Sequence, residues 1–214
     1  MPHALLWQAP MTQSKSIPEL TERIYGSCAM ANIQIRKYRD EDAEIVKELF
    51  TLGMSEHLQV LPGIRQMVIY MFNKYIETSL SKDLNNISET YLQQKDSCYW
   101  VAESDGRVVG TVACLPAESA PEFMELKRMS VRRSHRGMGI AKALCRIVAD
   151  FTRERGFPAV ILHTTVVQTD AQKLYEHMGY TKTREFVVPE LAAKILNFKM
   201  FEYRLDLQQN KERD

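Results

Sequence analysis

Cysteine, glycine and proline are scarce in this chain, and neither sign of charge is in excess. Of its 214 residues only 4 are cysteine, 9 glycine and 8 proline, which excludes collagen-like, disulfide-rich and low-complexity chains. Its 28 basic and 27 acidic residues give a net charge of +1, so no overall field attracts a polyanion. Since 45% of the residues are hydrophobic, the sequence predicts an ordinary globular protein of one domain.

The cysteines Cys28, Cys98, Cys114 and Cys145 follow neither a paired nor a metal-binding spacing. The first residues also lack the basic stretch followed by an apolar stretch that marks a signal peptide. We therefore expect a cytoplasmic protein with reduced cysteines. Cys98, Cys114 and Cys145 fall within strand or helix patterns, and no Cys-His arrangement is visible, so no acyl-cysteine intermediate is expected. The histidines show no H-x-x-x-H or H-E-x-x-H spacing, so no metal site is expected.

Long hydrophobic runs are also missing. The longest run between Leu58 and Leu80 covers residues 67–72, far below the ~20 residues that a membrane-spanning helix needs. We expect no integral membrane segment. Peripheral contact with a membrane through one face of this segment is a second interpretation, less favoured than a helix that covers the sheet. The side chains concerned are Met67, Val68, Met71 and Phe72.

The chain divides into three parts by pattern. Residues 1–31 lack periodicity and end beside a second methionine, Met30, and they are expected to form a flexible extension. Residues 32–208 carry the folded domain, and residues 209–214 form a polar tail.

Alternating and helical patterns follow one another along the domain. Strands are predicted at residues 33–37, 98–104, 107–116, 122–131, 159–165, 180–188 and 199–207. Helices are predicted at residues 40–54, 64–80, 82–94, 140–156 and 168–178, with Asp40 as the cap of the first. Asp105-Gly106 is a strong signal for a two-residue hairpin. Hairpins followed by strands that alternate with helices predict an α/β fold, with one mixed and mostly antiparallel central sheet flanked by helices.

A glycine-containing loop lies between a predicted strand and the first turn of an amphipathic helix. Glycines at alternate positions let backbone amides converge, and the positive end of the helix dipole favours a phosphate group. The loop fits neither the P-loop nor the full dinucleotide fingerprint, in which Lys142 would have to be glycine or alanine. A tight turn that needs glycine only for its geometry is the alternative for the loop taken alone. Its residues are Arg136, Gly137, Met138, Gly139, Ile140 and Ala141.

Basic residues are concentrated around this loop. From Lys127 to Ala149 the chain has seven fixed positive charges and no acidic residue. Such a cluster suits a ligand with several phosphates, and a solvated basic face is the alternative. Nucleic acid is not expected as the ligand, because Phe151 lies on the apolar helix face and no stacking aromatics are interleaved with the charges.

Several segments together resemble a known family. Motifs A and B of the GNAT superfamily of acetyl-CoA-dependent N-acetyltransferases are similar to ELKRMSVRRSHRGMGIAKAL and AQKLYEHMGY. The camello-type branch of that superfamily, which acetylates cysteine conjugates and aspartate, is similar to IQIRKYRDEDAEIVKELFTLGMSEHL, NNISETYLQQKDSCYWVAES and MFEYRLDL. The resemblance covers residues 33–207 and implies a single GNAT fold. The long apolar hairpin usual in that branch is replaced here by LPGIRQMVIYMFNKYIETSL.

The resemblance assigns residues to acetyl-CoA. It implies that the amides of residues 136–141 hold the pyrophosphate and that Val131 pairs with the pantetheine arm. Backbone amides near Met129 and Val131 would stabilise the oxyanion. Gln168 stands where family members commonly have asparagine, so its contact with the pantetheine arm is expected to differ.

Two residues are implied in proton transfer. Glu125 matches a carboxylate base that takes the proton of the substrate ammonium, and Tyr175 matches the tyrosine that protonates the departing thiolate. For Glu125 the alternative is a surface glutamate paired with Lys127 on the same face of the strand, which would lower its pKa. For Tyr175 the alternative is a core residue.

The predicted function is direct transfer of an acetyl group from acetyl-CoA to a small primary amine in a ternary complex, by resemblance a free amino acid or cysteine conjugate. A protein lysine or N-terminal acetyltransferase is the alternative of the same class. A catalytically silent protein that binds coenzyme A is the alternative of a different class.

Overall fold

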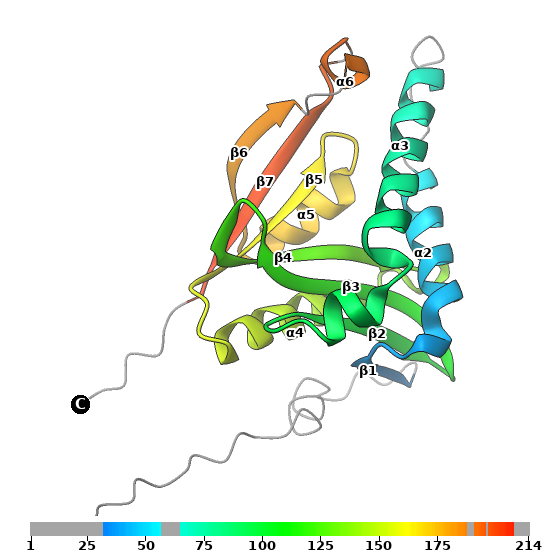
Figure 1. Cartoon of the computed structure of the whole chain (residues 1–214), viewed down its shortest axis with the longest axis vertical. Coiled ribbons are helices and arrows are strands. Elements are labelled where there is room, and N and C mark those ends of the chain that lie inside the picture. The colour runs from blue at the N-terminus through cyan, green and yellow to red at the C-terminus, as the bar shows by residue number, and fades with distance from the viewer. Residues whose placement is uncertain (1–31, 57–64, 188–190, 196, 208–214) are drawn as a thin grey trace, which may run out of the picture. The chain divides into compact units, whose positions relative to one another are not determined.

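A computed structural model describes residues 32–56, 65–187, 191–195 and 197–207. A seven-stranded sheet in the order β1-β2-β3-β4-β5-β7-β6 forms its centre (Figure 1). The strands are β1 Ile33–Lys37, β2 Cys98–Ser104, β3 Arg107–Ala117, β4 Ala120–Val131, β5 Ala159–Thr165, β6 Thr181–Val187 and β7 Lys199–Asp206. The α-helices are α2 Ala43–Ser55, α3 Arg65–Ser79, α4 Ile140–Glu154, α5 Thr169–His177 and α6 Leu191–Ile195. The extension and tail expected at residues 1–31 and 209–214 lie outside the described residues.

Strand direction confirms the expected sheet. In the described sheet β4 and β5 run parallel, while the other neighbouring strands pair antiparallel. The predicted Asp105-Gly106 turn joins β2 to β3, and both residues have positive φ, 50° and 75°, as a tight hairpin of this type requires. The chain thus has the expected α/β fold of mixed, mostly antiparallel strands.

Each face of the sheet has its own hydrophobic core. Helix α4 buries one apolar stripe, which includes Leu144 and Val148, against the face that carries Met124 and Leu126 of β4. Helix α2 covers the opposite face and packs Val46 there. Because neighbouring residues of a strand point to opposite faces, β4 supplies apolar residues to the α4 side while its alternate residues face the α2 side.

The pairing of β4 is irregular on both edges. Toward β5 the ladder consists of three pairs, from Met124 with Val160 to Leu126 with Leu162, and the rest of β4 after Leu126 is not paired with β5. Toward β3 the register shifts at Arg128, which has a left-handed φ of 55°. This β-bulge and the short ladder leave the second half of β4 free on its β5 edge.

Some sequence predictions on the α2 side need correction. The single helix expected over residues 82–94 is two short π-helical segments, η3 Leu80–Leu84 and η4 Ser88–Leu92. Asp40 does not cap α2, because it lies in a 3₁₀ turn before it, and the Asp42 carboxylate instead accepts the Arg39 amide at 2.9 Å. Helix α6 was not predicted, since five residues show no clear periodicity.

The apolar face of residues 67–72, for which membrane contact was the less favoured interpretation, is largely packed. Val68 and Phe72 of α3 are buried against Ala193 and Phe198. This supports the interpretation of α3 as a covering helix. None of the described helices is long and apolar enough to cross a bilayer.

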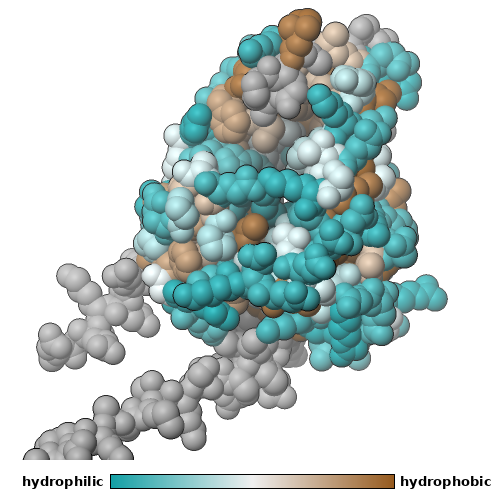
Figure 2. All heavy atoms as spheres, in the orientation of Figure 1, coloured by the Kyte–Doolittle hydropathy of each residue, from teal (hydrophilic) through white to brown (hydrophobic). Residues whose placement is uncertain are grey.

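Hydrophilic residues cover most of the face shown in Figure 2. Exposed apolar side chains on the protein include Leu191 and Ile195 of α6 and Tyr70 of α3.

Candidate active site

The glycine loop has the geometry expected of an anion-binding turn. Gly137 and Gly139 both have left-handed φ values, 79° and 81°, and a Cβ added at either would meet nothing within 4 Å. The open space shows that backbone shape, and not crowding, requires glycine here. Gly139 is also the N-cap of α4, so the first amides of that helix have no partner within the helix.

An open cleft of about 500 Å³ adjoins the loop. Leu49 and Gly53 of α2 line one side, and Val131, Arg133 and Arg136 line the other. A Cβ at Gly53 would stand 2.9 Å from Ser130 Oγ of β4, so this glycine lets α2 lie close to the strand.

Opposite charges are already paired at the cleft. Arg136 Nη2 lies 2.6 Å from Glu56 Oε2, and Arg136 Nε donates to the Val131 carbonyl at 3.1 Å. Arg132 reaches Glu48 of α2 at 3.4 Å. An entering polyphosphate would compete with these half-exposed carboxylates for the guanidinium groups.

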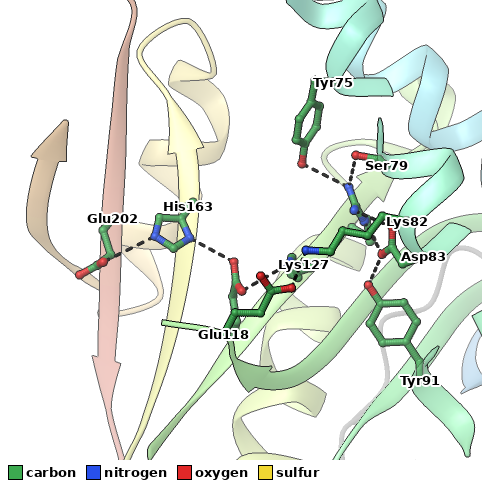
Figure 3. A network of polar contacts seen from close by, with 11 residues as sticks. Tyr75, Ser79, Lys82, Asp83, Tyr91, Glu118, Lys127, His163 and Glu202 are labelled. Carbon is green, nitrogen blue, oxygen red and sulfur yellow. Dashed lines mark hydrogen bonds and ion pairs between the residues drawn. The ribbon is translucent and has the colours of Figure 1, made fainter. Parts of the chain in front are cut away.

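Arg128 does not belong to the basic surface that the sequence predicted. Its guanidinium is buried, and it donates from Nε and Nη2 to the two oxygens of Asp83 at 2.8 and 2.7 Å and from Nη1 to Ser79 and Tyr75. Tyr91 donates to the same carboxylate of Asp83 (Figure 3). One of the seven positive charges is therefore neutralised inside the protein.

The Glu125 carboxylate lies on the side of the sheet that α2 covers. It pairs with Leu115 of β3, which packs against the α2 core. Glu125 Oε2 lies 3.4 Å from Lys127 Nζ, so the pair expected from strand alternation is present. Burial alone would raise the pKa of Glu125, but the hydrogen bond from His163 and the charge of Lys127 outweigh burial and lower it.

His163 is a partner that the sequence did not reveal. Its Nδ1 lies 3.1 Å from Glu125 Oε1, and its Nε2 lies 3.5 Å from Glu202 Oε2 of β7 (Figure 3). The hydrogen bond to Glu125, together with the charges of both carboxylates, raises the pKa of His163. Alternation on β5 could place His163 on a face, but only the β4–β5 register, which is not written in the sequence, shows that it meets Glu125.

Tyr175 lies on the other side of the sheet. It is buried in the α4 core, where its ring stands 5.7 Å from that of Tyr180 and 6.2 Å from that of Tyr203. Burial raises the pKa of Tyr175, so its hydroxyl stays protonated at physiological pH. Both the core interpretation and a proton-donating role agree with this position.

Gln168 immediately precedes α5 and is held by the end of β5. Its Oε1 accepts from Thr164 Oγ1, Thr165 N and Thr165 Oγ1 at 3.1 to 3.2 Å. The oxygen is thus committed to the chain, so that a contact with a ligand would come from the Nε2 amino group.

Cys98, Cys114 and Cys145 are buried free thiols, as small hydrophobic residues would be. Burial raises the pKa of Cys98 to about 11 and that of Cys145 to about 12, so neither is a thiolate at neutral pH. Among the described residues, no three of the histidine, cysteine, aspartate and glutamate type are grouped to hold a metal ion.

Comparison with known proteins decides the family. The acetyltransferase (GNAT) family model matches residues 66–180. The chain is 33% identical to the probable N-acetyltransferase camello of Xenopus tropicalis, over 84% of this chain and 100% of that one. It is 34% identical to N-acetyltransferase family 8 member 2 of Rattus norvegicus, over 83% of this chain and 96% of that one.

This chain belongs to the GNAT acetyltransferase family. Its relatives place it in the camello-type branch, as the motifs predicted. A crystal structure of a GNAT-family acetyltransferase from Staphylococcus aureus Mu50 shares the fold, with a TM-score of 0.61 at 20% identity over 82% of this chain and 99% of that one. The protein is an acetyl-CoA-dependent N-acetyltransferase.

The residues of this acetyltransferase fit a coenzyme A pyrophosphate. The two left-handed glycines leave an uncrowded backbone, the first turn of α4 offers free amides, and Arg133 and Arg136 line the adjoining cleft. The part of β4 that holds Met129 and Val131 has no β5 partner, so its backbone can pair with an extended arm. These features agree with the predicted acetyl-CoA residues.

Proposed function

We propose that this acetyltransferase acetylates a small amine that also carries a carboxylate, namely a free amino acid or a cysteine S-conjugate. The observation that carries the proposal is the pair of opposite charges on the side of β4 that α2 covers, which we name the acceptor side. Glu125 and Lys127 stand 3.4 Å apart and are both partly exposed. A carboxylate beside an ammonium group is the complement of the ammonium and carboxylate of an α-amino acid.

The two ligands would occupy different parts of β4. The amides of residues 136–141 and the arginines of the cleft would hold the pyrophosphate, and the free edge of β4 at Met129 and Val131 would position the arm that carries the acetyl group. Acetyl-CoA supplies the activated thioester. Glu125 faces the acceptor side while Tyr175 lies on the α4 side, so the base and the acid act on different partners.

Proton transfers complete the proposed reaction. Glu125 removes one proton from the ammonium, directly or through water, because only the neutral amine can attack. The nitrogen loses a second proton to water as the amide forms. Tyr175 gives its proton to the sulfur of the leaving coenzyme A and then regains one from water. Direct transfer is favoured over an acyl-cysteine because the described cysteines are buried and protonated.

The reaction class is tested by incubating the full chain with acetyl-CoA and pooled amines, following free thiol and identifying products by mass. Tyr175→Phe is expected to lower kcat by about 10²- to 10⁴-fold with acetyl-CoA binding kept. Gly139→Trp is expected to abolish that binding. In the unchanged chain, acetyl-CoA at 100 times its Kd should add about 2.7 kcal/mol of stability. Full activity of both variants would contradict the site.

The acceptor class is tested with Lys127→Gln. For an amino acid acceptor we expect KM to rise by about tenfold or more, because a charged hydrogen bond contributes about 1.5–3 kcal/mol. The matching amine without the carboxylate should show no such change. Lys182→Gln, on exposed β6, is the control. Acetylated peptide as the sole product would favour the protein-modifying alternative, and binding without transfer would favour a coenzyme A-binding protein.

A further inference from the structure

His163 lies between two carboxylates, and the predicted reaction does not yet use it. One ring nitrogen lies 3.1 Å from Glu125 Oε1 and the other 3.5 Å from Glu202 Oε2. All three side chains are more than 70% buried, with exposed fractions of 25%, 13% and 21%. Figure 3 shows the row running from β7 across β5 to β4.

The position of His163 follows from the short β4–β5 ladder. The last pair joins Leu126 to Leu162, so His163 is the first residue of β5 beyond it. It is paired on its other side with Glu202 of β7. The imidazole therefore stands where β4 and β5 separate, within reach of the carboxylate on the acceptor side.

The charged groups around His163 come from two strands. β4 presents Glu125, whose other oxygen faces Lys127, and β7 presents Glu202. β6 contributes the ring of Phe186, edge-on at 5.9 Å between centroids. A carboxylate faces each ring nitrogen, so the surroundings stabilise an imidazolium that carries a proton on both.

We propose that His163 takes over from Glu125 the proton that Glu125 removes from the acceptor amine, and that Glu202 stabilises the imidazolium so formed. The inference rests on the proposed function, since it needs Glu125 as the base. An N–H bond of the ammonium breaks as an O–H bond forms on Glu125. That O–H bond then breaks as Nδ1 of His163 is protonated, Glu125 is again a carboxylate, and the proton later leaves to water.

The relay explains how Glu125 can act as a base although its pKa is lowered. The hydrogen bond and the charge that lower the pKa of Glu125 make it a weak base while His163 is protonated. A neutral His163 removes that opposing charge and provides the next acceptor for the proton. His163 is thus a positioning residue that acts through Glu125, and the active form of the enzyme is the one in which its imidazole is neutral at the start.

The first test is the pH dependence of kcat. We expect kcat to rise with pH as His163 loses its proton, and this rise should lie above the ordinary histidine pKa of 6.5. Glu202→Gln should move this limb to lower pH, and His163→Gln should abolish it and lower kcat at alkaline pH by about tenfold or more. Glu185→Gln, on exposed β6, is the control and should match the unchanged enzyme. Deprotonation of the free amine affects all variants alike.

The second test does not depend on activity. The imidazole proton signal of His163, assigned from its loss in His163→Gln, is followed by NMR against pH in the full chain. We expect a titration above pH 6.5 that falls in Glu202→Gln. A titration at or below 6.5, or a kcat profile that neither variant changes, would overturn the relay alone. Absence of any product from the unchanged enzyme would overturn the proposed function and the relay together.

Discussion

Arg128 combines a left-handed backbone with a buried charge, and both are uncommon for a strand residue. Its φ of 55° lies at the register shift between β3 and β4, and its guanidinium reaches away from the strand to Asp83. The ring of Phe50 lies 5.0 Å from the guanidinium carbon, and that of Tyr75 lies 5.9 Å from it. The side chain thus anchors the bulge beside Met129, near which backbone amides are predicted to stabilise the oxyanion.

Substitution of Arg128 separates the role of its backbone from that of its charge. Arg128→Ala and Arg128→Gly both leave the buried Asp83 carboxylate with Tyr91 but without its charged partner, which we expect to destabilise the fold by about 3–5 kcal/mol. Alanine should cost about 1 kcal/mol more, because glycine adopts a positive φ without steric strain. Urea unfolding measures both values. Equal stability of the two variants would show that the left-handed conformation carries no strain.

Among elements, α2 begins with an ion pair rather than with the cap that the sequence predicted. Asp42 is buried and accepts from Arg36 Nη1 at 2.7 Å and Nη2 at 2.9 Å, in addition to the Arg39 amide. Burial would raise the pKa of Asp42, but the hydrogen bonds of Arg36 and Arg39 outweigh it and lower the pKa. The carboxylate therefore joins β1 to the start of α2.

The stability contributed by Asp42 should depend on pH. Because its pKa is lower in the folded than in the unfolded chain, its contribution is complete above the unfolded value and is lost as pH falls through the folded value. Asp42→Asn is expected to destabilise the protein by about 3 kcal/mol at pH 7 and by less at pH 3, which is below the unfolded value. Urea unfolding at both pH values measures this. A difference that stays constant with pH would contradict the assignment.

The local sequence pattern predicted those helices, strands and turns that local interactions determine. The Asp105-Gly106 hairpin, α4 with its apolar stripe, and β5 were all found within a few residues of their ends. The prediction of a single helix over residues 82–94 was wrong, because tertiary contacts determine the conformation of this segment. Asp83 in η3 accepts hydrogen bonds from Tyr91 in η4 and from Arg128, and a wider π-type turn accompanies that arrangement.

The contacts of the site also fall into those that local sequence predicts and those that it does not. The Glu125–Lys127 pair follows from strand alternation, and the glycine loop from its place between strand and helix. His163 and Glu202 could not be predicted as partners of Glu125, because they are brought there by the register of β5 against two other strands. The sequence also overestimated the basic surface, since burial of Arg128 is a property of the assembled core.

At the scale of the whole domain, the near-neutral composition conceals a local concentration of basic residues. Arg132, Arg133 and Arg136 line the cleft beside the glycine loop, where Glu48 and Glu56 pair with two of them. An anionic cosubstrate would have to compete there with two carboxylates, whereas the proposed acceptor would meet the Glu125–Lys127 pair.

The three-pair ladder between β4 and β5 also affects how the protein opens. It is the backbone connection between β1–β4 and the group β5, β7 and β6, and α4 packs on both sides of it. We expect native-state hydrogen exchange to show β6 and β7 opening as a unit at a lower free energy than β2 and β3. Uniform protection of all seven strands would contradict this. A ligand bound along β4 would then stabilise the connection between the two groups of strands and slow amide exchange in strands that it does not contact.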